Sequence, residues 1–202
     1  MRPTTLSLAL IASLSSSCAL AGNIADVVTV STGAGVAGAS VDVPIYIRDT
    51  SGTPLGIDQP AGSRIQSYSI KVDYAPAASV QSVTAARAGI TAGLTPLFES
   101  SPSAPGSISL LDTFQESTNL IPFTSNAALP GNQVAVLHFV LAASAAPGTI
   151  TLTLDPALTQ LTDESGSAAT RETTTAATLS LLNGSITVNP STPVRLQSFE
   201  VD

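Results

Sequence analysis

Hydrophobic and polar residues alternate with a period of two along much of this chain. The segment VDVPIYIR, residues 41–48, places two Val and two Ile on one side and Asp, Pro, Tyr and Arg on the other. The segment IQSYSIKVDY, residues 65–74, alternates in the same way. This period is typical of strands with one buried face. Both segments are therefore predicted strands. Because Pro44 cannot donate a ladder hydrogen bond, it indicates an edge position or a bulge in the first of them.

Further apolar segments bounded by turn residues predict more strands, at residues 26–31, 80–86, 97–99, 107–113, 133–141, 149–154 and 177–188. The segment 133–141, QVAVLHFVL, has no polar alternation beyond His138 and is expected to be a central, buried strand. Asn183 and Gly184 indicate either a hairpin turn or a bulge within one longer strand. The polar residues 161–175 predict a loop.

The pattern amounts to about nine strands and predicts no helix. The chain holds 14 Gly and 14 Pro, which are residues that supply turns. Short strands joined by such turns are typical of an all-β, two-sheet sandwich with jelly-roll topology. The inward positions of the alternating strands make up the expected core: Val41, Val43, Ile45, Ile47, Tyr68, Ile70, Val72, Tyr74, Val136, Leu152 and Ile186.

The first 21 residues have the pattern of a secretory signal peptide. Arg2 is followed by a short apolar run at residues 6–14, and an A-x-A site ends at Ala21, before Gly22. Cleavage there leaves a domain over residues 22–188 and a Pro-containing tail over residues 189–202. The apolar run is shorter than the roughly 20 residues of a membrane span, so the protein is expected to be secreted, with no transmembrane anchor. The alternative is a lipoprotein signal with anchoring through Cys18.

Charge and composition exclude several function classes. The net charge is −7 and the chain has a single Lys, whereas a surface that binds phosphates needs clustered Lys and Arg. A nucleic-acid partner is therefore not expected. Cys18 is the single Cys and would leave with the signal peptide, so neither a disulfide nor a Cys-based metal site is expected.

The sequence holds no clear catalytic constellation. His138 is the one His, and without a serine motif such as G-x-S-x-G a structural role is favoured over that of a general base. The adjacent Asp163 and Glu164 indicate a solvated loop. Asp73 and Asp112, both on predicted strands, could lie near each other, but nothing selects them as an acid–base pair. We expect no enzyme activity, no cofactor and no metal site.

The order of several segments carries a resemblance to a known family. They are VVTVSTGAGVAGASVDVPIYIRD (27–49), IQSYSIKVDYAPAASVQSVTAARAG (65–89), GSISLLDT (106–113), NQVAVLHFVLAASAAPGTITLTLD (132–155) and LLNGSITV (181–188). Together they span nearly all of residues 26–188. This order resembles that of cohesin domains, the receptor modules of bacterial cellulosomes and related cell-surface systems. The corner that usually reads Tyr-Asp-Pro in that family is Tyr74-Ala75-Pro76 here.

The resemblance implies a β-sandwich that docks a dockerin-like protein partner. It also implies a docking face on the outer side of the sheet that holds the third, fifth and sixth family strands. The corresponding outward positions here are Ser67, Ser69, Lys71 and Asp73 on one strand and Ser109, Leu111 and Thr113 on another.

Three other functions stay open at this point. Cohesins share their sandwich with certain carbohydrate-binding modules, so a polysaccharide ligand in a polysaccharide-degrading system is the second hypothesis. Sugar platforms usually need exposed aromatic rings, and of the three Tyr residues only Tyr46 points with the polar face. A structural spacer of the extracellular matrix is the third hypothesis, and an enzyme is the least favoured.

Overall fold

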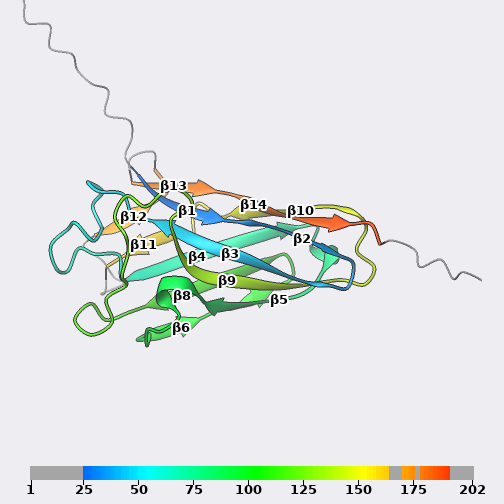
Figure 1. Ribbon diagram of the computed structural model, residues 1–202, viewed down its shortest axis with the longest axis horizontal. Coiled ribbons are helices and arrows are strands. Elements are labelled where there is room, and N and C mark those ends of the chain that lie inside the picture. Colours follow the sequence, from blue (N-terminus) through cyan, green and yellow to red (C-terminus); the bar gives the residue numbers. More distant parts are fainter. Residues whose placement is uncertain (1–24, 164–169, 176–177, 192–202) are drawn as a thin grey trace, which may run out of the picture.

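The computed structural model describes residues 25–163, 170–175 and 178–191. Over these ranges the chain forms fourteen strands and two single 3-10 turns. The strands make two sheets that lie face to face (Figure 1). The predicted all-β sandwich is therefore confirmed. The predicted signal peptide, its cleavage site at Ala21 and Gly22, Cys18 and the tail after residue 191 lie outside the described residues.

The first sheet has five strands, and it mixes parallel with antiparallel pairing. Their order is β13 (Leu179–Leu182), β1 (Asp26–Val30), β3 (Ser40–Arg48), β9 (Asn132–Leu141) and β5 (Val80–Arg87).

The second sheet has nine strands. Its main path is β12 (Arg171–Thr173), β11 (Gln160–Thr162), β4 (Ser67–Ala75), β10 (Gly148–Leu154), β14 (Gly184–Asn189) and β2 (Thr32–Val36). Off this path, β8 (Ser107–Thr113) pairs with β4 and with the short strands β6 (Phe98–Ser100) and β7 (Ser103–Ala104). The 3-10 turns are η1 (Ala77–Ser79) and η2 (Gly89–Thr91). No helix in the described part of the chain is long and apolar enough to cross a membrane.

The number of strands exceeds the predicted nine because several strands are too short to show an alternating pattern. Residues 161–175 were predicted to be a loop, which is wrong: β11 and β12 lie there and extend the sheet beside β4. Each has three residues, and their inward positions are Leu161, which is apolar, and Glu172, which is acidic. A buried acid inside a polar stretch gives no strand signal in the sequence.

The core lies between the sheets. The residues that the alternating pattern placed in it are buried, with one exception. Ten of the eleven expected core residues are buried, among them Ile45, Tyr68 and Tyr74. Tyr74 meets Phe139 of the opposite sheet edge-on, with ring centroids 5.6 Å apart, a favourable aromatic geometry.

Val136 was expected in the core, and this expectation is wrong. It is only half-buried, because the register between β3 and β9 shifts by one residue next to Val134. Such a shift flips the side chains on one side of it to the other face. Val134 and Leu137 fill the core instead. The outer side of β9 is half-exposed, so this strand is central in its sheet but not buried on both faces.

Pro44 lies just beyond the part of β3 that pairs with β1, Ile45–Arg48, so at this position β3 has a strand neighbour only on the β9 side, and the extra residue of the adjacent register shift, Val134, belongs to β9. Strand β3 pairs with β1 on one side and with β9 on the other, and the register shift falls directly after Ile45. The Pro44 carbonyl accepts a hydrogen bond from the Ser31 N–H at 3.0 Å.

The two sheets are joined where two chain segments pass from one sheet to the other side by side. Strand β1 continues into β2 of the second sheet at Ser31, and β13 continues into β14 at Asn183. A Cβ atom on Gly184 would lie 2.0 Å from the Ser31 carbonyl oxygen, so only glycine fits this crossing. Asn183 Oδ1 accepts the Leu154 N–H at 2.9 Å. Asn183 and Gly184 thus form neither the hairpin turn nor the simple bulge that the sequence indicated.

One end of the sandwich buries acidic side chains. Asp26 and Glu172 are fully buried, and each has one carboxyl oxygen without a hydrogen-bond partner, Asp26 Oδ2 and Glu172 Oε2. Asp26 Oδ1 accepts the Thr50 N–H at 2.7 Å, and Glu172 Oε1 accepts the Leu55 N–H at 2.8 Å. Burial first, and then Glu172, raise the pKa of Asp26 to about 9. One of the two carboxyls therefore carries a proton near neutral pH.

Gly184→Ala should destabilise the fold by about 1–3 kcal/mol or more, since the added methyl forces the two crossing segments apart. Urea unfolding of the variant measures the loss. Gly93→Ala is the control, because nothing lies within 4 Å of a Cβ there, and it should stay within about 0.5 kcal/mol of the wild type. Equal effects of the two substitutions would contradict the account of the crossing.

Asp26→Asn should flatten the pH dependence of stability. The pKa of Asp26 is about 9 in the folded protein and about 4 in an unfolded chain, so the folded state holds a proton that the unfolded state releases. Wild-type stability should therefore fall as pH rises from about 4 to 9. An Asn side chain has no charge at any pH, so this titration is absent from the variant. Urea unfolding at pH 5, 7 and 9 tests this, with half-exposed Asp73→Asn as the control for a lost charge, because its partner Lys71 keeps its charge over this range. Parallel profiles for wild type and Asp26→Asn would show that Asp26 does not titrate as described.

Candidate docking face

The seven residues predicted for docking lie on one surface, formed by the adjacent strands β4 and β8. The register pairs Ser67 with Thr113, Ser69 with Leu111 and Lys71 with Ser109, while Asp73 faces Ser107. Residues opposite each other in a ladder point to the same side of the sheet. Their neighbours along both strands, such as Ile70 and Leu110, point into the core. We call this surface, made by Ser67, Ser69, Lys71, Asp73, Ser109, Leu111 and Thr113, the β4–β8 face.

The β4–β8 face is less open than the strand pattern suggested. Ser67 was expected to be a free outward position, but only 8% of it is exposed and its hydroxyl hydrogen-bonds with that of Thr113 at 2.9 Å. The reason is β11, whose Thr162 lies directly opposite Ser67. The other six residues are half-buried.

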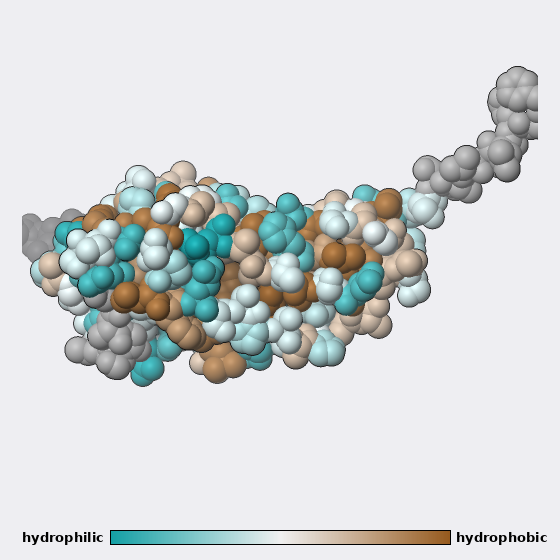
Figure 2. All heavy atoms as spheres, turned by 90° about the horizontal axis from the view of Figure 1, so that it is seen from below, coloured by the Kyte–Doolittle hydropathy of each residue, from teal (hydrophilic) through white to brown (hydrophobic). Residues whose placement is uncertain are grey.

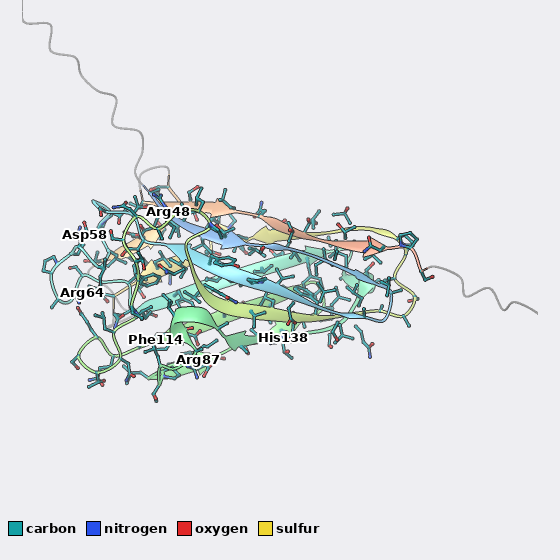
Figure 3. The ribbon with its side chains drawn as sticks, in the orientation of Figure 1. Arg48, Asp58, Arg64, Arg87, Phe114 and His138 are labelled. Carbon is teal, nitrogen blue, oxygen red and sulfur yellow. The ribbon has the colours of Figure 1, made fainter. Side chains whose placement is uncertain are left out.

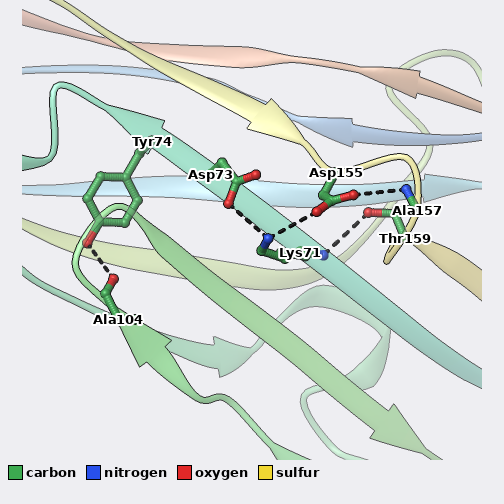
Figure 4. Close-up of polar contacts among 7 residues, drawn as sticks. All are labelled: Lys71, Asp73, Tyr74, Ala104, Asp155, Ala157 and Thr159. Carbon is green, nitrogen blue, oxygen red and sulfur yellow. Dashed lines mark hydrogen bonds and ion pairs between the residues drawn. The ribbon is translucent and has the colours of Figure 1, made fainter.

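Lys71 is held between two carboxylates near the middle of the face (Figure 4). Its Nζ lies 3.0 Å from Asp155 Oδ2 and 3.3 Å from Asp73 Oδ1. Hydrogen bonds to Asp155 and then Asp73 raise the pKa of Lys71, and the Lys71 ammonium in turn holds the pKa of Asp155 below its usual value. The single lysine is therefore oriented, and its charge is more than balanced by its two partners.

A short turn lies against the β4–β8 face and interrupts the strand beside β4. Strands β10 and β11 pair with successive parts of the same edge of β4, and residues 155–159 form a turn between them. The Ser69 hydroxyl donates to the Leu158 carbonyl at 3.0 Å. The Leu158 side chain is 51% exposed, so the turn presents an apolar residue next to Ser69.

Phe98 adds a second exposed apolar residue on the other side of Leu111. Strand β6 pairs with β8 so that Phe98 lies opposite Thr113 and Ser100 opposite Leu111. Phe98 is 55% exposed and is the one aromatic among the exposed large hydrophobic residues of the described ranges. Figure 2 views the molecule from the side of β5, β6 and β8, where hydrophobic and hydrophilic residues are interspersed.

Sequence reasoning missed both Phe98 and Leu158. Phe98 falls in the predicted short strand 97–99. The sequence does not show which strand pairs with it, so the side of the sheet to which Phe98 points could not be predicted. Leu158 falls in a turn that has no periodicity at all. The presence of a Phe at this position, in a chain with 4% aromatic residues, was the one available signal.

The other candidate residues lie away from the β4–β8 face. His138 Nδ1 lies 2.7 Å from Asp42 Oδ1 on the outer surface of the five-stranded sheet (Figure 3). Asp73 points outward while Asp112 is buried and faces the core, so these two carboxylates do not form a pair.

Asp163 is buried directly after β11 rather than solvated as expected, and Glu164 lies outside the described residues. Among the described side chains, no group of three or more His, Cys, Asp or Glu could hold a metal ion.

The comparisons with known proteins point to one fold. No family model and no curated protein matches the chain. Among solved structures, the sixth cohesin of Acetivibrio cellulolyticus scaffoldin B, solved with a dockerin, is 16% identical over 82% of this chain and 99% of its own, with a TM-score of 0.56. A cohesin from Clostridium acetobutylicum is 22% identical over 85% of this chain and 95% of its own, with a TM-score of 0.54.

A relative from outside cellulosomes matches as well. The non-cellulosomal cohesin of the archaeon Archaeoglobus fulgidus is 11% identical over 82% of this chain and 92% of its own, with a TM-score of 0.52. Whole cohesin domains thus align with more than four-fifths of the chain although few residues are shared. This protein has the fold of a cohesin domain.

Proposed function

We propose that this chain is a non-catalytic docking module that binds a dockerin-like protein on its β4–β8 face. The observation that carries the proposal is the gathering of Leu111, Phe98 and Leu158 on one polar sheet surface of a cohesin fold. Solved cohesins with this fold appear in complexes with dockerins.

The chemistry of the face suits a protein partner. Protein interfaces concentrate their binding energy in a few apolar or aromatic anchors surrounded by polar groups that exclude water. Leu111 provides a central anchor, and Phe98 and Leu158 flank it from β6 and from the turn after β10. The hydroxyls of Ser69, Ser109 and Thr113 and the Lys71–Asp155 pair provide the polar surround.

We further propose that the module acts outside the cell, in a polysaccharide-related system. The support for export is the A-x-A site before Gly22 after a short apolar run. Lipid attachment at Cys18 is the alternative, and N-terminal sequencing of exported material distinguishes the two.

A carbohydrate ligand is the second candidate, because Phe98 offers an exposed ring on the same face. Sugars stack on the flat face of an aromatic ring, whereas a protein anchor needs only apolar surface. The two candidates therefore differ in what they require at position 98.

Leu111→Asp should weaken capture of the protein partner more than tenfold, which corresponds to about 1.4 kcal/mol, since it puts a charge at the centre of the apolar group. Lys71→Glu should act in the same direction, because it breaks the pairing with Asp155 and Asp73. Thr84→Asp, exposed on β5 of the other sheet, is the matched control and should bind normally.

The partner for this measurement is a dockerin captured from the exoproteome of the source organism, and urea unfolding shows that each variant remains folded. If Leu111→Asp and Lys71→Glu both bind as the wild type does, the docking site lies elsewhere.

Phe98→Leu should preserve binding to a protein partner within about threefold, whereas Phe98→Ala should weaken it, because truncation removes the anchor while Leu keeps its apolar surface. Affinity electrophoresis in polysaccharide gels is run beside the capture assay. The carbohydrate function is favoured instead if a polysaccharide gel retards the wild type but neither variant, and if no protein partner is captured.

A further inference from the structure

An open hollow lies on the outer side of the five-stranded sheet, where β1, β3 and β13 meet the loops at one end of the sandwich. Its volume is about 620 Å³, which is comparable to the roughly 300–1,000 Å³ of small-ligand sites. The register places Ser180, Val27 and Arg48 in one row across the three strands. Figure 3 labels Arg48 at this end of the molecule. Besides Ala25, the hollow is lined by Val27, Arg48, Thr50, Ser51, Asn126 and Ser180.

Arg48 is held in place by its neighbours but keeps free donors. Its Nε donates to the Ala127 carbonyl at 2.8 Å and its Nη1 to the Thr50 hydroxyl at 3.1 Å. The Thr50 hydroxyl in turn donates to the Ala25 carbonyl at 2.9 Å. A guanidinium carries five N–H donors. Both donors on Nη2 and the second one on Nη1 therefore have no acceptor among the described residues. The side chain is preoriented and keeps donors for a ligand.

No carboxylate balances the charge of Arg48 within the described ranges. Arg64 and Arg87, which are half-buried like Arg48, each pair with a glutamate, at 3.4 Å and 3.0 Å. None of the ion pairs found there involves Arg48. Asp26 on β1 is buried and accepts the Thr50 N–H instead. The hollow thus presents a half-buried cation without a counter-ion, and this favours an anionic ligand.

The rest of the lining suits a ligand that is rich in hydroxyl groups. The Ser51 N–H donates to Asn126 Oδ1 at 3.1 Å, and Asn126 Nδ2 donates to the Ser51 hydroxyl at 2.7 Å. The backbone of Asn126 has a φ of 54°, a left-handed conformation that Asn tolerates, and its N–H donates to the Asp49 carbonyl at 2.8 Å. Ser180 is exposed on β13. With Val27 as its one large apolar residue, this lining offers hydrogen bonds rather than an apolar anchor point.

Tyr46 adds an aromatic ring on the same side of β3. It lies two residues before Arg48, and residues two apart on a strand point to the same face. Both are half-buried, whereas Ile45 and Ile47 lie in the core. Tyr46 is also the one Tyr that the sequence placed on a polar face. A ring beside hydroxyl-rich side chains is typical of surfaces on which sugars stack.

We propose that this hollow binds a uronic acid unit of an acidic polysaccharide, with Arg48 as the residue that recognises the sugar carboxylate. The planar fork of guanidinium donors matches the two oxygens of a carboxylate. The Ser180 hydroxyl and the Asn126 amide bind sugar hydroxyls, and Tyr46 stacks against an adjoining unit. The hollow lies on the five-stranded sheet and the β4–β8 face on the other, so the proposal does not depend on the docking function.

The first test is calorimetric titration of the full domain with tetragalacturonate. The methyl-esterified tetramer has the same rings without the charges, and it should bind at least about tenfold more weakly. Raising NaCl from about 0.05 M to about 0.5 M should also weaken binding of the acid, because salt screens the attraction of charges near the surface. Equal affinity for the acid and its ester would overturn the proposal, as would the absence of binding at millimolar tetramer.

The second test uses variants of the hollow. Arg48→Gln should weaken binding of tetragalacturonate at least about tenfold. Because Arg48 also bonds to Ala127 and Thr50, Ser180→Glu separates binding from folding: it puts a negative charge in the hollow from an exposed position, and its effect should be as large. Arg171→Gln is the matched control, since it removes an exposed positive charge outside the hollow, and it should bind as the wild type does. Wild-type affinity in either folded hollow variant would contradict the proposal.

The third test locates the ligand. Titration of ¹⁵N-labelled protein with tetragalacturonate should shift the amide resonances of Ser51, Asn126 and Ser180 and leave those of Lys71 and Leu111 on the β4–β8 face unchanged. The absence of shifts around the hollow would overturn the site. A tetraglutamate peptide is titrated in parallel. If it binds as tightly as the sugar and shifts the same amides, an acidic protein segment is the ligand and the sugar proposal is wrong.

Discussion

The arrangement of the two sheets depends on one close contact, between Gly184 and the Ser31 carbonyl oxygen. Two chain segments leave the five-stranded sheet at this level and enter the nine-stranded sheet together, so β1 and β13 pair in one layer and β2 and β14 pair in the other. The backbones approach so closely that a single methyl group would not fit. Because both crossings occur at the same place, the inward faces of the two layers stay opposed along their length, and the core can close with contacts such as Tyr74 on Phe139.

The β4–β8 face depends indirectly on that closed core. Ile70 and Leu110 hold β4 and β8 against the opposite layer, which leaves the alternate side chains on the outside. The turn at residues 155–159 then changes this outer surface from a plain polar strand pair into a shaped one. It places Asp155 beside Lys71 and Leu158 beside Ser69. The interruption between β10 and β11, which both pair with β4, is thus what orients the lysine and adds an apolar residue at the rim.

The end of the sandwich that carries the β3–β4 loop is stabilised by a different kind of interaction. There the loop is held by buried carboxylates that accept backbone N–H groups, rather than by apolar packing alone. Carboxylates that are buried close together and form no ion pair among the described residues are stabilised when protons reduce their charge. The folded state of this end is therefore sensitive to what the surrounding solution provides, whereas the apolar core is not.

The sequence by itself determined the sandwich, the inward residues of β3 and β4, and the side of β8 that faces out, because strand alternation is a local property with a period of two. Even the cohesin fold was accessible from the order of the segments. Tertiary structure decided everything that depends on which strands become neighbours. The shift at Val134 moved Val136 out of the core, β11 buried Ser67, and β6 carried Phe98 to the face that holds Leu111. Gly184 shows the reason most directly: its neighbour Ser31 is more than 150 residues away in the chain, and no local pattern records a contact made only when the two layers close.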